Sequence, residues 1–245
     1  MIKSLIDHGK NYYGSVLLNP STLAALCTSQ ECWGEIFKFH HLLVTDEYTQ
    51  YVDTYYRESR QRFGDSWRYF DIVNVLYGAS KTLQPTNYLE IGVRRGRSAC
   101  AVARACPSVN IAAFDLWQQN YAGMENPGPD FVRAELRKHG HTGNLAFYDG
   151  DSHQTIPLFF QKHPTQQFDI ITVDGDHSEA GAMDDLKNVI PHLAVGGVIV
   201  FDDISHPSLP HLHGVWQRVR EQFPFLATFE FRESGFGVAF AIRKE

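Results

Sequence analysis

Residues 87–96 read NYLEIGVRRG, a short apolar stretch that leads into two glycines with three residues between them. A buried strand followed at once by a glycine turn and a helix is typical of an open α/β sheet. The glycines let the backbone turn tightly and approach a ligand at the carboxyl end of the strand. The spacing is E-x-G-x-x-x-G, so the G-x-G-x-x-G pattern of dinucleotide-binding turns is absent.

The alternation of apolar stretches and helical spacing continues on both sides of this turn. Continuous apolar strands separated by helices indicate a parallel sheet covered on both faces. Two final strands have only the Ser234-Gly235 turn between them and are expected to pair as an antiparallel hairpin. The predicted strands are residues 87–93, 109–116, 145–151, 168–175, 198–204, 226–233 and 238–243. The predicted helices are residues 97–106, 152–162, 178–193, closed by Gly196-Gly197, and 215–223.

The first 65 residues have a different character, with many aromatic residues and histidines. Residues 21–43 and 47–62 have helical spacing, and residues 67–83 are predicted to form the helix that leads into the first strand. We interpret residues 1–65 as a helical extension or cap, and residues 66–245 as the sheet domain.

Composition excludes several classes of protein. The chain has 245 residues and is 43% hydrophobic, which is enough to build a core. Its formal net charge of −6, without a run of Lys and Arg, argues against binding of nucleic acid. No run of about 18 apolar residues predicts a membrane span, and the polar N-terminus lacks a secretory signal. The four cysteines form no CxxC pair, which favours free thiols and a cytoplasmic location.

Acidic residues fall at the ends of the first three strands. Glu90 suits a positively charged ligand, Asp115 can accept from both hydroxyls of a ribose, and Asp151 can accept from an adenine amine. Each acid alone is equally well explained as a helix N-cap or a solvated loop residue. Three acids at successive strand ends make a ligand site the better interpretation.

A second group of acids follows the fourth and fifth strands. These strands end in VDGDH, residues 173–177, and in FDDI, residues 201–204. Asp174, Asp202 and Asp203 should therefore converge, and all-oxygen ligation favours Mg²⁺ or Mn²⁺. His177 has a suitable unperturbed pKa for a general base. The alternatives are that His177 caps a helix, or that the acids pair with arginines such as Arg94 or Arg95.

Together these motifs resemble the class I S-adenosylmethionine-dependent methyltransferases. The likeness is greatest to the metal-dependent O-methyltransferases that modify macrolide sugars and other natural products, and it covers roughly Trp67–Glu245. It implies a Rossmann-like, seven-stranded α/β methyltransferase sheet with a terminal antiparallel hairpin. The chain differs from catechol methyltransferases, which have Asp-Asn after the fifth strand, and it lacks the long N-terminal domain of the macrolide-sugar enzymes.

The resemblance also implies roles for individual residues. Asp174, Asp202 and Asp203 would hold Mg²⁺ or Mn²⁺, and His177, together with Asp174, would be catalytic. S-adenosylmethionine would be the cofactor, and a hydroxyl of a small molecule, a sugar or another natural product, would receive the methyl group. The residues expected at the cofactor are Glu90, Gly92, Gly96, Ser98, Asp115, Leu116, Trp117, Asp151, Ser152 and Asp174.

The acceptor itself has no readable motif. Six aromatic residues and histidines could line its pocket, although a place in the core is the better interpretation for them: Tyr12, Tyr13, His40, His41, Trp117 and Tyr121. Two other functions stay open, a nicotinamide-dependent dehydrogenase and a non-catalytic binding protein on the same fold. No nucleic-acid or membrane partner is expected, and a homo-oligomer is left open.

Overall fold

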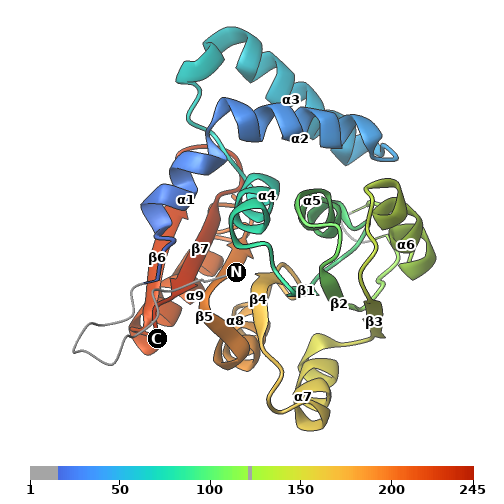
Figure 1. Cartoon of the computed structure of the whole chain (residues 1–245), viewed down its shortest axis with the longest axis vertical. Coiled ribbons are helices and arrows are strands. Elements are labelled where there is room, and N and C mark those ends of the chain that lie inside the picture. Colours follow the sequence, from blue (N-terminus) through green and yellow to red (C-terminus); the bar gives the residue numbers. More distant parts are fainter. Residues whose placement is uncertain (1–15, 121–122) are drawn as a thin grey trace.

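The computed structural model describes residues 16–120 and 123–245, arranged in layers about one seven-stranded sheet (Figure 1). The strand order is β3-β2-β1-β4-β5-β7-β6, and β7 is the strand that runs antiparallel to β5 and β6. The predicted seven-stranded sheet with a terminal hairpin is confirmed. The strands are β1 (Asn87–Ile91), β2 (Asn110–Asp115), β3 (Leu145–Asp149), β4 (Phe168–Val173), β5 (Leu193–Asp202), β6 (Leu226–Phe231) and β7 (Val238–Arg243).

Helices cover both faces of the sheet, which is why its central strands are apolar on both sides. One face carries α4 (Ile72–Leu83), α5 (Arg97–Ala105) and α6 (Pro129–Lys138), and the other carries α7 (Ser152–Lys162), α8 (Glu179–Val189) and α9 (His211–Gln222) (Figure 1). Successive side chains of a strand enter different cores. Tyr88 belongs to the cluster beneath α4 and α5, whereas Leu89 belongs to the cluster with α7, α8 and α9.

Three N-terminal helices extend the first of these layers: α1 (Pro20–Cys27), α2 (Gln30–Leu42) and α3 (Glu47–Phe63). In Figure 1, α1 lies beside α4 and β6, while α2 and α3 lie above α4 and α5. Their buried residues share one apolar cluster with α4 and α5. The division of the chain at residue 65 stays a prediction.

Several element boundaries differ from the predicted ones for local reasons. The helix predicted over residues 21–43 is two helices, because the Ser29 side chain accepts from the backbone N–H of Cys32 and begins α2. The helix predicted from Trp67 begins at Ile72, because Asp71 and Asn74 form a capping box. Helix α6 was not predicted at all.

The turn predicted at Gly196-Gly197 is also wrong, since β5 begins at Leu193 and both glycines lie within it. Gly197 is needed for close approach, because a Cβ there would lie 2.8 Å from the carbonyl oxygens of Ala194 and Asp169. The helix before it ends at Val189 and is followed by a 3₁₀ turn. Helix α9 begins at His211, four residues before the predicted start.

All four cysteines are free thiols, as predicted, and all four are buried. Within residues 16–120 and 123–245, the structure contains no helix with the length and apolar character needed to cross a membrane.

Candidate functional site at the carboxyl edge of the sheet

Strand register brings the two groups of motifs to one edge. Ile91 of β1 is the partner of Val173 of β4, which is in turn the partner of Phe201 of β5. The residues that follow these positions, Gly92, Asp174 and Asp202, therefore leave the sheet at the same level. This register explains how motifs far apart in the sequence form one site.

Gly92 lies at the closest contact between these loops. Its φ is +85°, and a Cβ at this position would lie 1.8 Å from the carbonyl oxygen of Asp174. No other residue fits there without moving the backbone. Gly96, with φ of +73°, is the N-cap of α5, and a Cβ there would lie 2.8 Å from the Val132 side chain. Both predicted glycines are thus required by the turn itself.

Glu90 is fully buried beneath this turn. The Ser98 hydroxyl donates to Oε1, while Oε2 has no hydrogen-bond partner among the described residues. Burial raises the pKa of Glu90 to about 8, and the nearby charges of Asp174 and Asp115 act in the same direction. A buried carboxyl group with one open oxygen suits a positively charged ligand, so Glu90 and Ser98 fit their predicted place at the cofactor.

Asp115 organises the turn through its own carboxylate. Oδ2 accepts from the backbone N–H groups of Val93 and Arg94, both at 2.7 Å, and Oδ1 accepts from the backbone N–H of Trp117 at 2.5 Å. The structure therefore assigns Asp115 a positioning role in addition to the predicted contact with a ribose. That ribose contact stays a prediction.

Trp117 lies at the edge of the sheet rather than in the core. Its indole N–H donates to Asp149 at 2.6 Å, and its ring packs edge-on against Phe147. Leu116, beside it, is 60% exposed. The positions of Trp117 and Leu116 are therefore compatible with the predicted contact with a nucleoside.

Asp151 caps α7, which is the alternative that the sequence left open. Its carboxylate accepts from the backbone N–H of His153 at 2.9 Å and from the Gln154 side chain at 3.2 Å. Ser152 lies close enough to the buried carboxyl group of Asp185 to lower its pKa, which burial raises to about 6. The adenine contact predicted for Asp151 and Ser152 is compatible with this cap but has no direct support.

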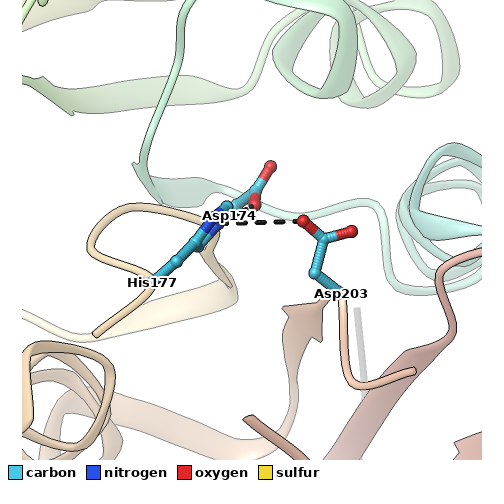
Figure 2. Close-up of side chains that lie close together, drawn as sticks. All are labelled: Asp174, His177 and Asp203. Atoms are coloured by element: carbon cyan, nitrogen blue, oxygen red, sulfur yellow. Dashed lines mark hydrogen bonds and ion pairs between the residues drawn. The ribbon is translucent and has the colours of Figure 1, made fainter. Parts of the chain in front are cut away.

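Figure 2 shows that Asp174, His177 and Asp203 converge from the loops after β4 and β5. His177 Nε2 lies 3.2 Å from Asp174 Oδ1 and 3.9 Å from Asp203 Oδ2. Each side chain offers one ligand atom, and these atoms all lie within 4.8 Å of one another. Two carboxylate oxygens and one imidazole nitrogen are a donor set that fits a divalent cation such as Mn²⁺ or Mg²⁺.

The composition of this group differs from the predicted metal site in one member. His177 is within it, and Asp202 is not. Asp203 has φ of +62°, a left-handed conformation that an aspartate tolerates better than most residues, and Asp202 ends β5 beside it. Asp202 instead lines a neighbouring cavity together with Asp203.

The carboxylates outnumber the positive charges around them. Burial raises the pKa of Asp203 to about 7, and the charge of Asp174 adds to the effect. Burial, followed by the charges of Asp203 and Asp174, raises the pKa of Asp202 well above its usual range. Burial would lower the pKa of His177, but the hydrogen bond and charge of Asp174 outweigh it and raise that pKa. A divalent cation would relieve this repulsion.

Arginine pairing does not account for these acids. Arg94 and Arg95 instead form ion pairs with Asp46 at the start of α3, at 2.7 and 3.5 Å. The alternative that Arg94 or Arg95 neutralises the acids is therefore not what the structure contains. Their pairing ties the glycine turn to the N-terminal helices.

The cavity beside Asp202 and Asp203 has a volume of about 160 Å³. Its walls come from α3, from the extended segment before α4, from the first residue of α5, from the end of β5 and from the β6–β7 turn. The lining residues are Tyr48, Tyr51, Val52, Tyr55, Tyr56, Tyr69, Asp71, Arg97, Asp202, Asp203, Gly235, Phe236 and Gly237.

Sequence reasoning missed most of this cavity. His40, His41 and Trp117 are not among its lining residues, and His40 is buried against Phe39 and Tyr56. Tyr12, Tyr13 and Tyr121 lie outside the described residues. The available signal was the spacing of aromatic residues along α3 at positions 48, 51 and 55, which places them on one face of a helix.

Known proteins resemble this chain at three levels. Residues 89–204 match the family model of a methyltransferase domain. Over 141 residues the chain is 30% identical to the 8-demethyl-8-(2,3-dimethoxy-alpha-L-rhamnosyl)-tetracenomycin-C 4'-O-methyltransferase of Streptomyces olivaceus, covering 49% of this chain and 54% of that protein. The chain thus spans about half the length of this relative.

Solved structures extend the likeness to nearly the whole chain. The O-methyltransferase TomG of Streptomyces achromogenes, solved with S-adenosylmethionine, matches with a TM-score of 0.57 at 19% identity, over 89% of this chain and 99% of that one. The methyltransferase PaMTH1 of Podospora anserina, with bound S-adenosylhomocysteine, matches with a TM-score of 0.52 at 18% identity, over 95% and 100%. The TDP-rhamnose 3'-O-methyltransferase of calicheamicin biosynthesis matches with 0.53 at 16%, over 93% and 97%. At these identities the match establishes the fold.

Proposed function

We propose that this chain, which has the class I methyltransferase fold, is an S-adenosylmethionine-dependent O-methyltransferase that acts on a sugar or another small natural product. The observation that carries the proposal is the group of Asp174, His177 and Asp203, which lies between the glycine turn and an aromatic cavity. A cofactor at the turn and an acceptor in the cavity would meet at this group.

The cofactor half of the proposal is supported by Glu90 and the turn above it. The open oxygen of Glu90 is placed to attract a positively charged cofactor, and Gly92 leaves space for close approach. Two proteins of the same fold were solved with S-adenosylmethionine or S-adenosylhomocysteine. By contrast, the turn lacks G-x-G-x-x-G, and β7 is antiparallel, so a nicotinamide-dependent dehydrogenase is not favoured.

A divalent cation is the second part of the proposal. Asp174 and Asp203 would hold it, and Asp202 would complete the ligand set, so that His177 can act as the base. When bound, such an ion supplies Lewis acidity that lowers the pKa of an acceptor hydroxyl. The grouping of Asp174, Asp202 and Asp203 supports this assignment, because these carboxylates repel one another when no cation is bound.

His177 would move the proton. The imidazole lies between Asp174 and Asp203, whose charges favour its protonated form and therefore its acceptance of a proton from the acceptor hydroxyl. The hydroxyl oxygen then forms a bond to the methyl carbon as the sulfur–carbon bond breaks. The cavity walls and the turn would keep the two reactants in line, which can account for several kcal/mol of the barrier.

Binding experiments test the proposal before the acceptor is known. Titration calorimetry should show one site for S-adenosylmethionine, and the water-proton relaxation of Mn²⁺ should show one ion per chain. The substitution Asp203→Asn should abolish Mn²⁺ binding, while Asp184→Asn, a change at an exposed acid of α8, should leave it intact. If the parent protein binds neither cofactor nor Mn²⁺, the proposal is contradicted and a non-catalytic binding role is favoured.

A further inference from the structure

The backbone between the two glycines of the turn has an uncommon conformation. Arg94 has φ of +48°, in the left-handed region that residues other than glycine seldom adopt. Such a conformation costs free energy and persists only where the surrounding structure enforces it. Two carboxylates hold Arg94, because its backbone N–H donates to Asp115 at 2.7 Å and its guanidinium donates to Asp46 at 2.7 Å. The turn is therefore fixed in part by the residue that begins α3.

Asp46 uses one oxygen for α3 and the other for the turn. Oδ1 accepts from the backbone N–H of Thr49 at 2.8 Å and so caps the helix. Oδ2 accepts from Arg94 and lies 3.5 Å from Arg95 Nε. Burial would raise the pKa of Asp46, but the hydrogen bonds from Thr49 and the charges of the two arginines outweigh burial and lower that pKa. Asp46 is therefore a carboxylate at neutral pH, and its charge holds the two elements together.

Arg95 strengthens the same connection. Its guanidinium donates to the Val44 carbonyl oxygen at 3.2 Å and pairs with Glu125 at 2.9 Å. It also lies over the Phe131 ring, 4.4 Å from the ring centre, and only 9% of the side chain is exposed. Val44 precedes α3, and Phe131 belongs to the first turn of α6. Arg95 therefore joins the segment before α3 to the glycine turn and to α6.

Helix α3 supplies one wall of the cavity in which the acceptor is proposed to bind. Its lining residues there are Tyr48, Tyr51, Val52, Tyr55 and Tyr56. The Tyr48 ring also faces the turn, since the guanidinium groups of Arg94 and Arg97 lie 5.5 and 5.7 Å from its centre. A displacement of the start of α3 would therefore change the wall of the cavity and the support of the turn together.

We propose that Asp46 is a positioning residue that couples cofactor binding at the glycine turn to the shape of the acceptor cavity. The inference rests on the proposed function and adds a residue to it. A cofactor that contacts the turn favours the state in which Arg94 keeps its left-handed conformation. Because Asp46 joins Arg94 to α3, the cofactor then also favours the closed position of the start of α3. The aromatic wall is completed before the acceptor enters, so the cofactor should bind first.

Amide hydrogen exchange measures this coupling without an acceptor. Each protein is studied alone and with S-adenosylhomocysteine at 100 times its own Kd, which suppresses any opening that releases the ligand about 100-fold. In the parent we expect exchange to slow about 10- to 100-fold both in the turn, residues 92–96, and at the start of α3, residues 49–56. In Asp46→Asn the slowing should persist in the turn and disappear in α3. Asparagine caps helices as well as aspartate does, so this change removes the ion pair and keeps the cap.

Two further variants complete the experiment. Glu58→Gln removes an exposed ion pair with Arg62 on the same helix and should behave as the parent does. Arg94→Gln should weaken the protection of α3 as Asp46→Asn does, and the double variant should show no further change, because the two substitutions remove one interaction.

The possible results separate coupling from a purely structural role. If α3 exchanges faster in Asp46→Asn but the ligand still slows it as in the parent, Asp46 only stabilises the helix and the inference is overturned. A parent whose turn is protected by the ligand while α3 is not would overturn it as well. A parent that binds no S-adenosylhomocysteine in calorimetry would contradict the proposed function itself, and the inference with it.

Discussion

Two groups of carboxylates lie along the same edge of the sheet, and they differ in their hydrogen-bond partners and in the charges around them. In the half formed by β1, β2 and β3, Asp115 accepts from three backbone N–H groups and Asp151 caps a helix. In the half formed by β4 and β5, Asp202 and Asp203 are half-buried beside Asp174, and their pKa values are raised. The first group is stabilised by the protein itself, whereas the second is short of positive charge.

The comparison teaches which acids need a ligand. A carboxylate that already has its donors is part of the scaffold before any ligand binds, so its removal should disturb the loop as well as binding. Carboxylates that repel one another cost stability in the unliganded protein and regain it when a cation binds. Glu90 is the exception in the first half, since it is buried with an open oxygen and resembles the second group.

The largest effect is expected at His177. His177→Ala should lower the turnover of methyl transfer about 10²–10⁴-fold, the range typical of a positioned general base. Cofactor affinity, measured by calorimetry, should not change. Unaltered Mn²⁺ affinity in the same variant would support the role of His177 as a general base. Loss of Mn²⁺ binding would instead show that His177 is a ligand of the cation.

The next effect concerns Asp203. Asp203→Asn should lower turnover about 10²–10³-fold, as loss of one electrostatic stabiliser typically does, and it should remove Mn²⁺ binding. The unliganded variant should nevertheless be more stable than the parent above pH 7. The folded-state pKa of Asp203, about 7, is above its ordinary value, so the parent loses stability as pH rises towards and through 7. Thermal unfolding at pH 6 and pH 8 measures the difference, and no gain at pH 8 would contradict it.

Asp115→Asn should have a smaller effect on function, and it should destabilise the unliganded protein where Asp203→Asn stabilises it. Cofactor affinity should fall about 10- to 100-fold, because a charge-assisted hydrogen bond of about 1.5–3 kcal/mol is lost. The unliganded variant should be less stable than the parent, since the N–H groups of Val93 and Arg94 lose the charged acceptor that holds the turn. Calorimetry and urea unfolding measure the two quantities. Unchanged cofactor affinity together with reduced stability would confine Asp115 to the scaffold.

The smallest and most specific effect is the pH dependence at Glu90. The pKa of Glu90 in the folded protein, about 8, lies above its ordinary value near 4.5, so the folded state holds its proton more tightly than the unfolded state. The resulting stability is complete below pH 4.5 and is lost as pH rises through 8. Glu90→Gln should reduce this loss by about 1–3 kcal/mol between pH 5 and pH 8.5, as measured by urea unfolding. It should also weaken cofactor binding, since the cofactor loses an opposite charge. Parallel pH profiles for parent and variant would contradict the assignment.

The elements that the sequence predicted best are those fixed by local patterns. Helix α7 and strand β7 were predicted with their observed bounds, and the seven strands with their terminal hairpin follow from apolar stretches and turn residues. Helix α6 was missed because the charged sequence between β2 and β3 has few apolar residues. The start of α4 was misplaced because Asp71 acts as a cap, and the buried aromatic residues before it resemble a helical segment.

The sequence by itself determined the fold class and the acids at the strand ends, because strand periodicity, glycine turns and the rule that parallel strands end at one edge are local or topological. Only the tertiary structure decided which of these acids receive hydrogen bonds and which face one another, because that depends on loop paths and on distances of a few ångströms. The same holds for the cavity: Tyr48, Asp71 and Arg97 are far apart in sequence and meet only when α3 packs over the sheet edge. Packing between distant segments, not local preference, brings these side chains together.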